Sequence, residues 1–203
     1  MQKLDAMYPG FASEFSEDKI TRDLNTIATE ADRLFDIFRD FAGKISTLSS
    51  NEPEKINVSR MIESEIRFAD FYLDFKHDIS KTFELDGNLP EIIGNVADYS
   101  LCISALINSA RERMKNSPEK EIFISTSHDE THIHIMFQDT GVAISGECNK
   151  ISGDTGAAFD IDALPDAERG MGLALLLLKH YGSRIRIGAE NGSSAVSISI
   201  PYR

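Results

Sequence analysis

The segment Gly170-Met171-Gly172-Leu173-Ala174-Leu175 continues as an apolar run to Leu178 and ends in Lys179-His180-Tyr181-Gly182. This pattern predicts an amphipathic helix that is opened by two glycines two positions apart. Because glycine has no Cβ, the backbone there can come close to a phosphate while the N–H groups of the helix start point at it. Gly-x-Gly before a helix is also a common tight turn, so the segment has to be interpreted with its neighbours.

Two segments upstream give the glycine pair its setting. Phe137-Gln138-Asp139-Thr140-Gly141 is typical of an apolar strand that ends in an acid and a glycine. Residues 95–114 predict a long helix that carries Asn108 and Ser109. The ordered set of helix, strand with Asp-x-Gly, and Gly-x-Gly with a helix favours an inherited nucleotide site over an unrelated cap and turn.

Composition limits the possible partners and location. The 203 residues allow one large domain or two small ones, and a hydrophobic content of 41% can build a core. A net charge of -12 argues against nucleic acid and anionic membranes as partners. The cysteines, Cys102 and Cys148, lack metal-ligand spacing and are expected to be reduced thiols. The longest apolar run is too short to cross a bilayer and no leader opens the chain, so we expect a cytoplasmic protein without membrane contact.

The first part of the chain predicts one long helix from about Ser16 to Ser50, in which apolar residues recur at three-and-four spacing. Its apolar stripe consists of Leu24, Ile27, Ala31, Leu34, Phe38, Phe41, Ile45 and Leu48. A stripe this long and apolar needs a partner helix, so we expect a homodimer formed through it. The polar segment 49–54, which contains Pro53, predicts a linker.

The rest of the chain predicts an α+β fold. We expect helices at about 58–73 and 96–115 and from Gly170 onward, with strands at 77–85, 121–126, 132–137, 184–188 and 195–200. Residues 145–168 are rich in Gly, Asp and Ala without periodicity and predict a mobile loop. The expected architecture is a mixed sheet with helices on one face, in which 1–52 form a helical segment and 53–203 form one domain.

From Glu54 to Pro201 the sequence resembles the ATP-binding domain of sensor histidine kinases and related ATPases of the Bergerat type. Residues 88–95 resemble the entry into that family's Asn-box helix. Residues 139–144 resemble its Asp-x-Gly-x-Gly-Ile box, and residues 170–175 resemble its Gly-x-Gly-Leu-Gly-Leu box. The resemblance implies an α/β sandwich that binds ATP and Mg²⁺, with Asp139 accepting a hydrogen bond from the adenine amino group and the glycine pair contacting the phosphates. The nucleotide-binding positions that it implies are Asn108, Ser109, Glu112, Asp139, Gly141, Ala143, Ile144, Gly170, Met171, Gly172 and Leu173.

The resemblance leaves two registers open for the Mg²⁺ ligand of the Asn box. Asn108 gives Asn-Ser-Ala-Arg, which resembles Asn-Ala-x-Arg, whereas Ser109 gives Ser-Ala-Arg-Glu-Arg-Met, which resembles Asn-Ala-x-Glu-Ala-Met. We favour Ser109, because that register keeps the spacing from Asn95 and places one apolar stripe in the core. The stripe consists of Tyr99, Cys102, Ile103, Leu106, Ile107 and Ala110. A serine hydroxyl is a poorer Mg²⁺ ligand than an amide oxygen.

The sequence also departs from the family. Ala143 stands where the family has glycine, and the acidic stretch 145–169 is poorly suited to face phosphates. No histidine precedes Ser50, where a histidine kinase carries its phosphorylated residue, so we identify no acceptor histidine in this chain. The five histidines, which we interpret as structural, are His77, His128, His132, His134 and His180.

Two functions follow from the resemblance. The leading one is the ATP-binding catalytic domain of a two-component sensor histidine kinase, which passes a phosphoryl group to a histidine outside this chain. The alternative is a degenerate, kinase-like docking protein of a phosphorelay that binds a response regulator without ATP turnover. A serine kinase for an anti-sigma partner would fit the ATP domain but not the long first helix. The implied partners are a receiver domain or an acceptor-histidine helix.

Overall fold

The computed structural model describes residues 19–29, 31, 52–153, 159–190 and 192–203. The chain divides into two compact units, residues 1–49 and residues 50–203. In the first unit the described residues are helical, and Ile20, Leu24 and Ile27 are 43%, 59% and 64% exposed. The remainder of the helix predicted from Ser16 to Ser50, and most of its apolar stripe, lies outside the described residues. No helix in the described ranges is both long and apolar enough to cross a membrane.

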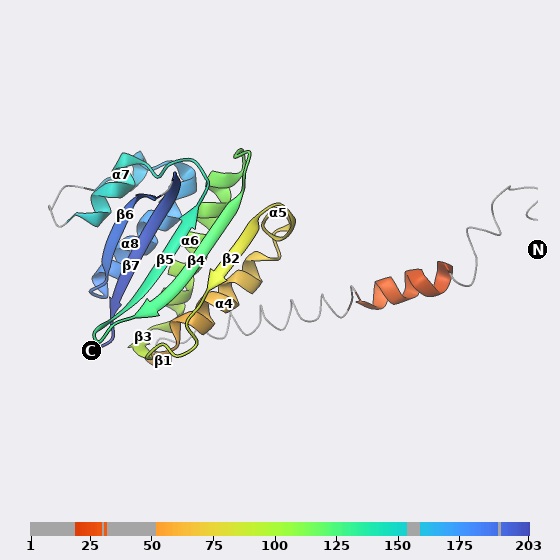
Figure 1. The fold of residues 1–203 in the computed structure, drawn as a ribbon, viewed down its shortest axis with the longest axis horizontal. Helices are drawn as coiled ribbons and strands as arrows, with labels where there is room; N and C mark the ends of the chain where they lie inside the picture. Colours follow the sequence, from red (N-terminus) through yellow and green to blue (C-terminus); the bar gives the residue numbers. More distant parts are fainter. Residues whose placement is uncertain (1–18, 30, 32–51, 154–158, 191) are drawn as a thin grey trace, which may run out of the picture. The chain divides into compact units, whose positions relative to one another are not determined.

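The second unit is built on a mixed five-stranded sheet with the strand order β2-β4-β5-β7-β6 (Figure 1). Strand β2 runs parallel to β4, and every other neighbouring pair is antiparallel. The strands are β2 (Ser80–Glu84), β4 (Glu121–His128), β5 (His132–Asp139), β6 (Arg184–Glu190) and β7 (Ser193–Pro201). A separate antiparallel pair is formed by β1 (Glu54–Ile56) and β3 (Ile92–Gly94). The predicted α+β class with a mixed sheet is confirmed.

Three helices cover one face of this sheet, namely α4 (Val58–Ala69), α6 (Val96–Met114) and α8 (Asp166–His180) (Figure 1). The burial pattern of β5 shows the difference between the two faces of the sheet. Ile133, Ile135 and Phe137 are buried, while the residues between them are only half-buried. This alternation is what a strand shows when one face meets a core and the other meets water. The core therefore lies between the helices and this face.

Helix α6 forms the middle of the helical layer. Asn95 caps its start by accepting a hydrogen bond from the N–H of Asp98 at 3.2 Å. All six residues of the predicted apolar stripe are buried, whereas Leu101 and Asn108 on the opposite side are exposed. The periodicity thus predicted both the helix and the face that it presents to the core.

Three regions differ locally from the prediction. His77 lies in the last turn of a short helix, α5 (Leu73–His77), and the strand predicted at 77–85 begins only at Ser80. Strands β1 and β3 were not predicted, since three residues are too few to show an alternating pattern. Within 145–168 the structure contains α7 (Gly146–Asn149), η1 (Lys150–Ser152) and η2 (Ile161–Ala163), so the described part of this segment is not without structure.

The largest correction concerns the glycine pair. Helix α8 begins at Asp166, four residues before Gly170, so the glycines lie inside the helix and do not open it. Pro165 precedes the helix, and Asp166 and Glu168 lie in its first turn, where negative charge is favoured by the helix dipole. This acidic turn explains why the helix starts earlier than the glycine pattern indicated.

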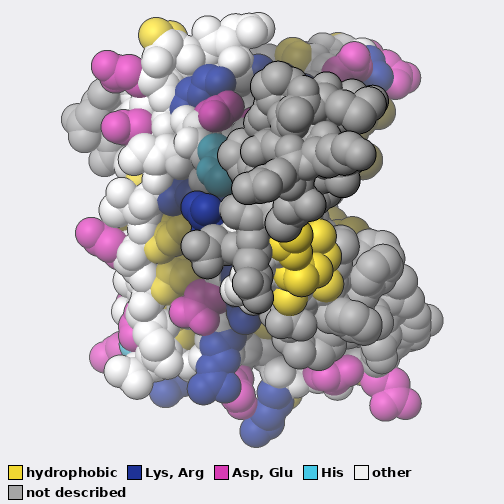
Figure 2. Space-filling model, turned by 90° about the vertical axis from the view of Figure 1, so that its right-hand side faces the viewer, with side chains coloured by type: hydrophobic (Ala, Val, Ile, Leu, Met, Phe, Trp, Pro, Cys, Tyr) yellow, Lys and Arg dark blue, Asp and Glu magenta, His cyan; other side chains and the backbone are white. Residues whose placement is uncertain are grey.

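Charged side chains of both signs are spread over the face of the molecule drawn in Figure 2. Asp and Glu outnumber Lys and Arg in the sequence, 33 to 21, which gives the net charge of -12. Several of the ion pairs on the described residues join side chains three positions apart, such as Lys150 with Glu147 at 2.6 Å and Arg169 with Asp166 at 3.0 Å. Pairs this exposed add little to stability.

Candidate nucleotide site

The end of α6, the end of β5 and the first turns of α8 meet around one buried carboxylate. Asp139 is the last residue of β5, and its side chain is only 4% exposed. Its Oδ1 accepts a hydrogen bond from the N–H of Gly141 at 3.0 Å. Its Oδ2 accepts a hydrogen bond from Nη2 of Arg113. Both carboxylate oxygens are therefore engaged by groups of this chain.

Arg113 is the central residue of the site and was not among the predicted site residues. Its Nη1 donates to Oγ of Ser109 at 2.8 Å and lies 3.6 Å from Sδ of Met171. Its side chain is 4% exposed, like that of Asp139. The sequence signal that could have found it is its spacing, because Arg113 follows Ser109 by four residues and so shares a helix face with it.

Electrostatics in this cluster are set by burial. Burial raises the pKa of the Asp139 carboxyl, while the Arg113 guanidinium and the N–H of Gly141 act in the opposite direction. The backbone is packed as tightly as the side chains, since a Cβ at Gly141 would lie 2.7 Å from Cβ of Arg113. An ion pair sealed in this way is fixed in place, because separating the charges would leave each without a partner.

The two candidate metal ligands point in different directions. Ser109 is 2% exposed and its hydroxyl accepts from Arg113, whereas Asn108 is exposed and its Oδ1 accepts from Nη2 of Arg111 at 2.9 Å. Glu112 belongs to this second, outer network, where it accepts from Arg111 at 2.7 Å. Among the described residues no group of three or more His, Cys, Asp or Glu could hold a metal ion. The two candidate ligands thus belong to different networks, Ser109 to that of Arg113 and Asn108 to that of Arg111.

The glycine-rich segment is covered on its buried side. Met171 and Gly172 are buried, and a Cβ on Gly172 would lie 2.6 Å from Leu164 and 3.3 Å from Phe159. Gly170 and Leu173 are exposed on the other side of the helix. Since N–H groups this far into an α-helix bond to carbonyls of the preceding turn, those of the glycine pair are not presented to a ligand.

The segment between the Asp139 strand and α8 is bonded to side chains of α8 at two places. Glu168 is 3% exposed, and its carboxylate accepts from the N–H of Ser145 at 3.0 and 3.2 Å and from its hydroxyl at 2.5 Å. Nζ of Lys179 donates to the carbonyls of Ile151 and Gly153 at 2.9 and 3.1 Å. The described part of this lid segment, residues 145–153 and 159–168, therefore packs on α8.

The structure thus brings only some of the predicted positions together. Ser109, Asp139, Gly141 and Met171 surround Arg113, whereas the side chains of Asn108 and Glu112 bond to Arg111 and Gly170 and Leu173 are exposed. Ala143 is exposed, and Ile144 is half-buried against the core.

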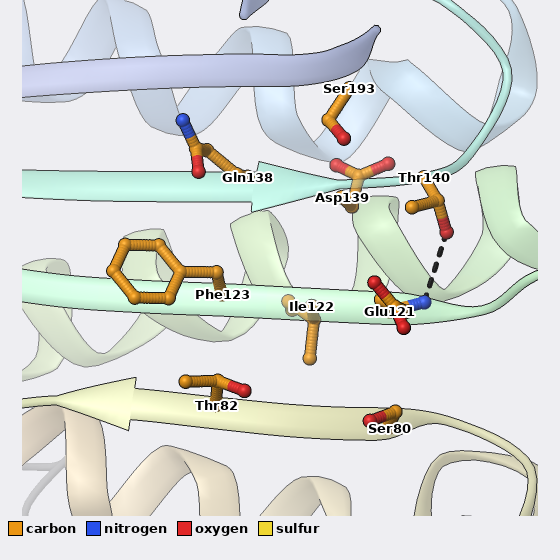
Figure 3. Close-up of a pocket in the computed structure, with 9 residues that line it drawn as sticks. All are labelled: Ser80, Thr82, Glu121, Ile122, Phe123, Gln138, Asp139, Thr140 and Ser193. Atoms are coloured by element: carbon orange, nitrogen blue, oxygen red, sulfur yellow. Dashed lines mark hydrogen bonds between the residues drawn. The ribbon is translucent and has the colours of Figure 1, made fainter. Parts of the chain in front are cut away.

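A separate depression of about 210 Å³ lies on the opposite, open face of the sheet. Figure 3 shows it between β2, β4 and β5, with the hydroxyl of Thr140 accepting from the N–H of Glu121 at 2.9 Å. Its lining residues are Ser80, Thr82, Glu121, Ile122, Phe123, Gln138, Asp139, Thr140 and Ser193. Asp139 lines this depression and also belongs to the Arg113 cluster, so the two lie next to each other at the end of β5.

Comparisons with known proteins relate the fold to solved structures. No protein-family model matches the sequence, and no curated protein does. The catalytic domain of histidine kinase ThkA is similar, with a TM-score of 0.57 at 16% identity over 74% of this chain and 96% of that one. The Acinetobacter baumannii histidine kinase AdeS has a TM-score of 0.56 at 15% identity over 100% of this chain and 94% of that one.

A third structure, histidine kinase ThkA in complex with the response regulator protein TrrA, has a TM-score of 0.51 at 16% identity over 93% of this chain and 53% of that one. At identities of 15–16%, these similarities support a shared fold. With the sheet order, the helical layer and the position of the Asp139 strand, they identify the second unit of this chain as having the fold of the ATP-binding domain of histidine kinases.

Proposed function

We propose that this chain is a kinase-like docking domain of a two-component phosphorelay, which binds a receiver domain without ATP turnover. The observation that carries the proposal is the closed phosphate side of the site. Gly172 is buried beneath Leu164 and Phe159, and the glycine pair lies inside α8. A phosphate chain needs open N–H groups at this place, and those of the glycine pair lie within the helix.

The metal side supports the same conclusion. Phosphoryl transfer from ATP relies on a metal ion that bridges the phosphates. The hydroxyl of Ser109 is occupied by Arg113, and the amide oxygen of Asn108 is occupied by Arg111. Each candidate ligand oxygen already accepts a hydrogen bond from an arginine, whose positive charge opposes a Mg²⁺ ion beside it.

The fold supports a receiver domain as the partner. ThkA, which shares this fold, has been solved in complex with a response regulator. A receiver-binding role places the chain in the cytoplasm, where the two-component partners meet. It needs no acceptor histidine in the chain and no bound nucleotide.

The second candidate is the ATP-binding catalytic domain itself, which would pass a phosphoryl group to a histidine outside this chain. It is favoured by the ordered pair of motifs, Asp139-Thr140-Gly141 and then the segment 170–175. For this function Arg113 would have to leave Asp139, and Leu164 would have to move off Gly172. Both changes open buried contacts.

Binding measurements separate the two functions. The full chain is titrated with a fluorescent ATP analogue in Mg²⁺, and receiver domains are tested for binding with and without ATP. We expect saturable receiver binding that ATP does not change, and no saturable nucleotide binding up to millimolar concentration. Micromolar ATP affinity in Mg²⁺ would instead establish the catalytic function, and lack of binding to every receiver would refute the docking role.

We also propose a homodimer formed through the first helix. Leu24 and Ile27 are more than half exposed on the described part of this helix, and an apolar stripe of that kind is unstable in water without a partner. Light scattering at micromolar concentration should give the mass of a dimer. Replacing both residues with Glu would bury unpaired carboxylates at such an interface and should give the mass of a monomer. A monomeric parent protein would contradict the proposal.

A further inference from the structure

We propose that Asp139, Ser109 and Met171 form a binding site, called the pocket below, for a planar guanidinium or amidinium group, and that Arg113 of the chain itself fills it. This proposal does not depend on whether the chain binds a receiver domain. It differs from a nucleotide site in the ligand that it recognises, which is a flat cation with N–H donors at its edge.

The walls of the pocket consist of acceptors that suit such a cation. Asp139 supplies a carboxylate oxygen, Ser109 supplies a hydroxyl oxygen at 2.8 Å, and Met171 supplies a thioether sulfur at 3.6 Å. A guanidinium presents several N–H donors in one plane and no acceptor, so it matches three acceptors around its edge. A neutral or acidic ligand would leave the buried carboxylate without a counter-charge.

The contacts of Arg113 lie at the end of its side chain. Nη1 and Nη2 make the contacts described above, whereas Nε is buried and has no hydrogen-bond partner in the described structure. The stem reaches the pocket past Gly141, where a Cβ would meet Arg113 at 2.7 Å. The pocket thus contacts the two terminal nitrogens of the guanidinium. A free guanidinium compound presents the same N–H groups without the aliphatic part of the arginine side chain.

Removing the side chain of Arg113 creates the empty site. Truncation leaves the Asp139 carboxylate buried without its cation, which is a strongly destabilising state. A ligand that binds the folded state alone raises its stability as its concentration exceeds the dissociation constant. A small guanidinium compound should therefore restore stability to the truncated protein and not to the parent protein.

The test uses the full chain with Arg113→Ala and methylguanidinium at low millimolar concentration, with sodium chloride at equal ionic strength as the salt control. We expect the melting temperature of Arg113→Ala to lie below that of the parent protein and to rise by several degrees, saturably, with methylguanidinium. The matched control is Arg111→Ala, which removes the same charge from the same helix outside this pocket. The parent protein and Arg111→Ala should show no saturable rise.

A second measurement covers the case in which Arg113→Ala does not fold by itself. The unfolded variant is refolded by dialysis with and without methylguanidinium, and recovery of native circular dichroism is followed. The double variant Arg113→Ala/Asp139→Asn, which has no buried charge left to pair, should show no response to the ligand. The proposal is overturned if Arg113→Ala neither gains stability nor refolds with methylguanidinium, or if the control or the double variant responds equally. This failure would leave the receiver-binding measurements unaffected.

Discussion

Arg111 and Arg113 lie two residues apart on α6 and have opposite surroundings. Arg111 contacts Asp74 at 3.2 Å and Glu112 at 2.7 Å, and its guanidinium lies 4.0 Å over the ring of Tyr72. Those two acids are 36% and 25% exposed, whereas Asp139, which pairs with Arg113, is 4% exposed. The outer network shares its charge between two acids that keep contact with water. Among the described residues the inner pair has no second ion-pair partner, so the same residue type should have very different energetic effects at the two positions.

The largest effect should come from breaking the inner pair. Arg113→Ala should lower the free energy of unfolding by roughly 3–5 kcal/mol, because it leaves a buried carboxylate unpaired. Urea unfolding of the variant and the parent protein measures this difference. Replacing both partners by apolar residues, as in Arg113→Met/Asp139→Leu, should cost much less than the single change. If the double change costs as much as the single one, charge pairing is not the main contribution of Arg113.

The contact between Glu168 and Ser145, which holds the lid segment on α8, should give an intermediate effect. Glu168→Gln should cost about 1–3 kcal/mol, because a buried carboxylate that accepts from the N–H and hydroxyl of Ser145 becomes an amide with weaker acceptors. Trypsin should then cleave after Lys150 faster than in the parent protein. Asp166→Asn is the control, since that side chain lies in the same helical turn and is 91% exposed. Equal cleavage rates in the two variants would show that Glu168 does not hold the lid.

The outer network should give a smaller effect. Arg111→Ala should cost about 1–2 kcal/mol, since its half-exposed ion pairs and its cation–π contact each contribute up to about 1 kcal/mol. Its effect should shrink further in high salt, whereas the effect of Arg113→Ala should not, because buried pairs are screened little. Urea unfolding at low and high sodium chloride checks both statements. A large, salt-independent loss for Arg111→Ala would remove the contrast between the two positions.

The smallest effect should come from an exposed carboxylate in the β4–β5 turn. The N–H groups of Thr131 and His132, followed by His134, hold the pKa of Asp129 well below its usual range. A carboxyl whose pKa is lower in the folded state adds stability above its unfolded pKa of about 3.9 and loses it as the pH falls further. Unfolding between about pH 5 and pH 2 should therefore be less pH-dependent in Asp129→Asn than in the parent protein. Parallel pH profiles of the two proteins would contradict this role.

The sequence predicted the helical layer well because periodicity reports on burial. The stripe from Tyr99 to Ala110 required one helix face in the core, and the structure buries all of it. The α4 region was predicted as one helix to Leu73, but α4 ends at Ala69 and a second short helix follows. That break depends on local backbone hydrogen bonds at residues 70–72, which carry no periodic signal.

The candidate site was predicted less well, because its contacts depend on side chains from distant elements. We predicted that Asp139 accepts a hydrogen bond from the adenine amino group. Its buried position at the end of β5 follows from the alternating pattern of the strand. The residue that occupies its carboxylate lies 26 positions earlier in the chain, and no periodicity links the two. The resemblance pointed to the glycine pair at a helix start, whereas the acidic turn at Asp166 and Glu168 started the helix sooner. Whether the eleven carried-over positions bind nucleotide stays a prediction for the titration.

The strand order also has a consequence for how this chain folds during synthesis. The β4–β5 and β6–β7 pairs are hairpins of neighbouring strands and can form as soon as each is made. In contrast, β2 emerges early but pairs in parallel only with β4, and the centre of the sheet closes only when β7 joins β5. A chain still attached to the ribosome before β7 therefore has one edge of β5 unpaired, and unpaired edges of this kind template aggregation. Strand β7, which follows the other strands along the chain, thus joins β6 to the rest of the sheet.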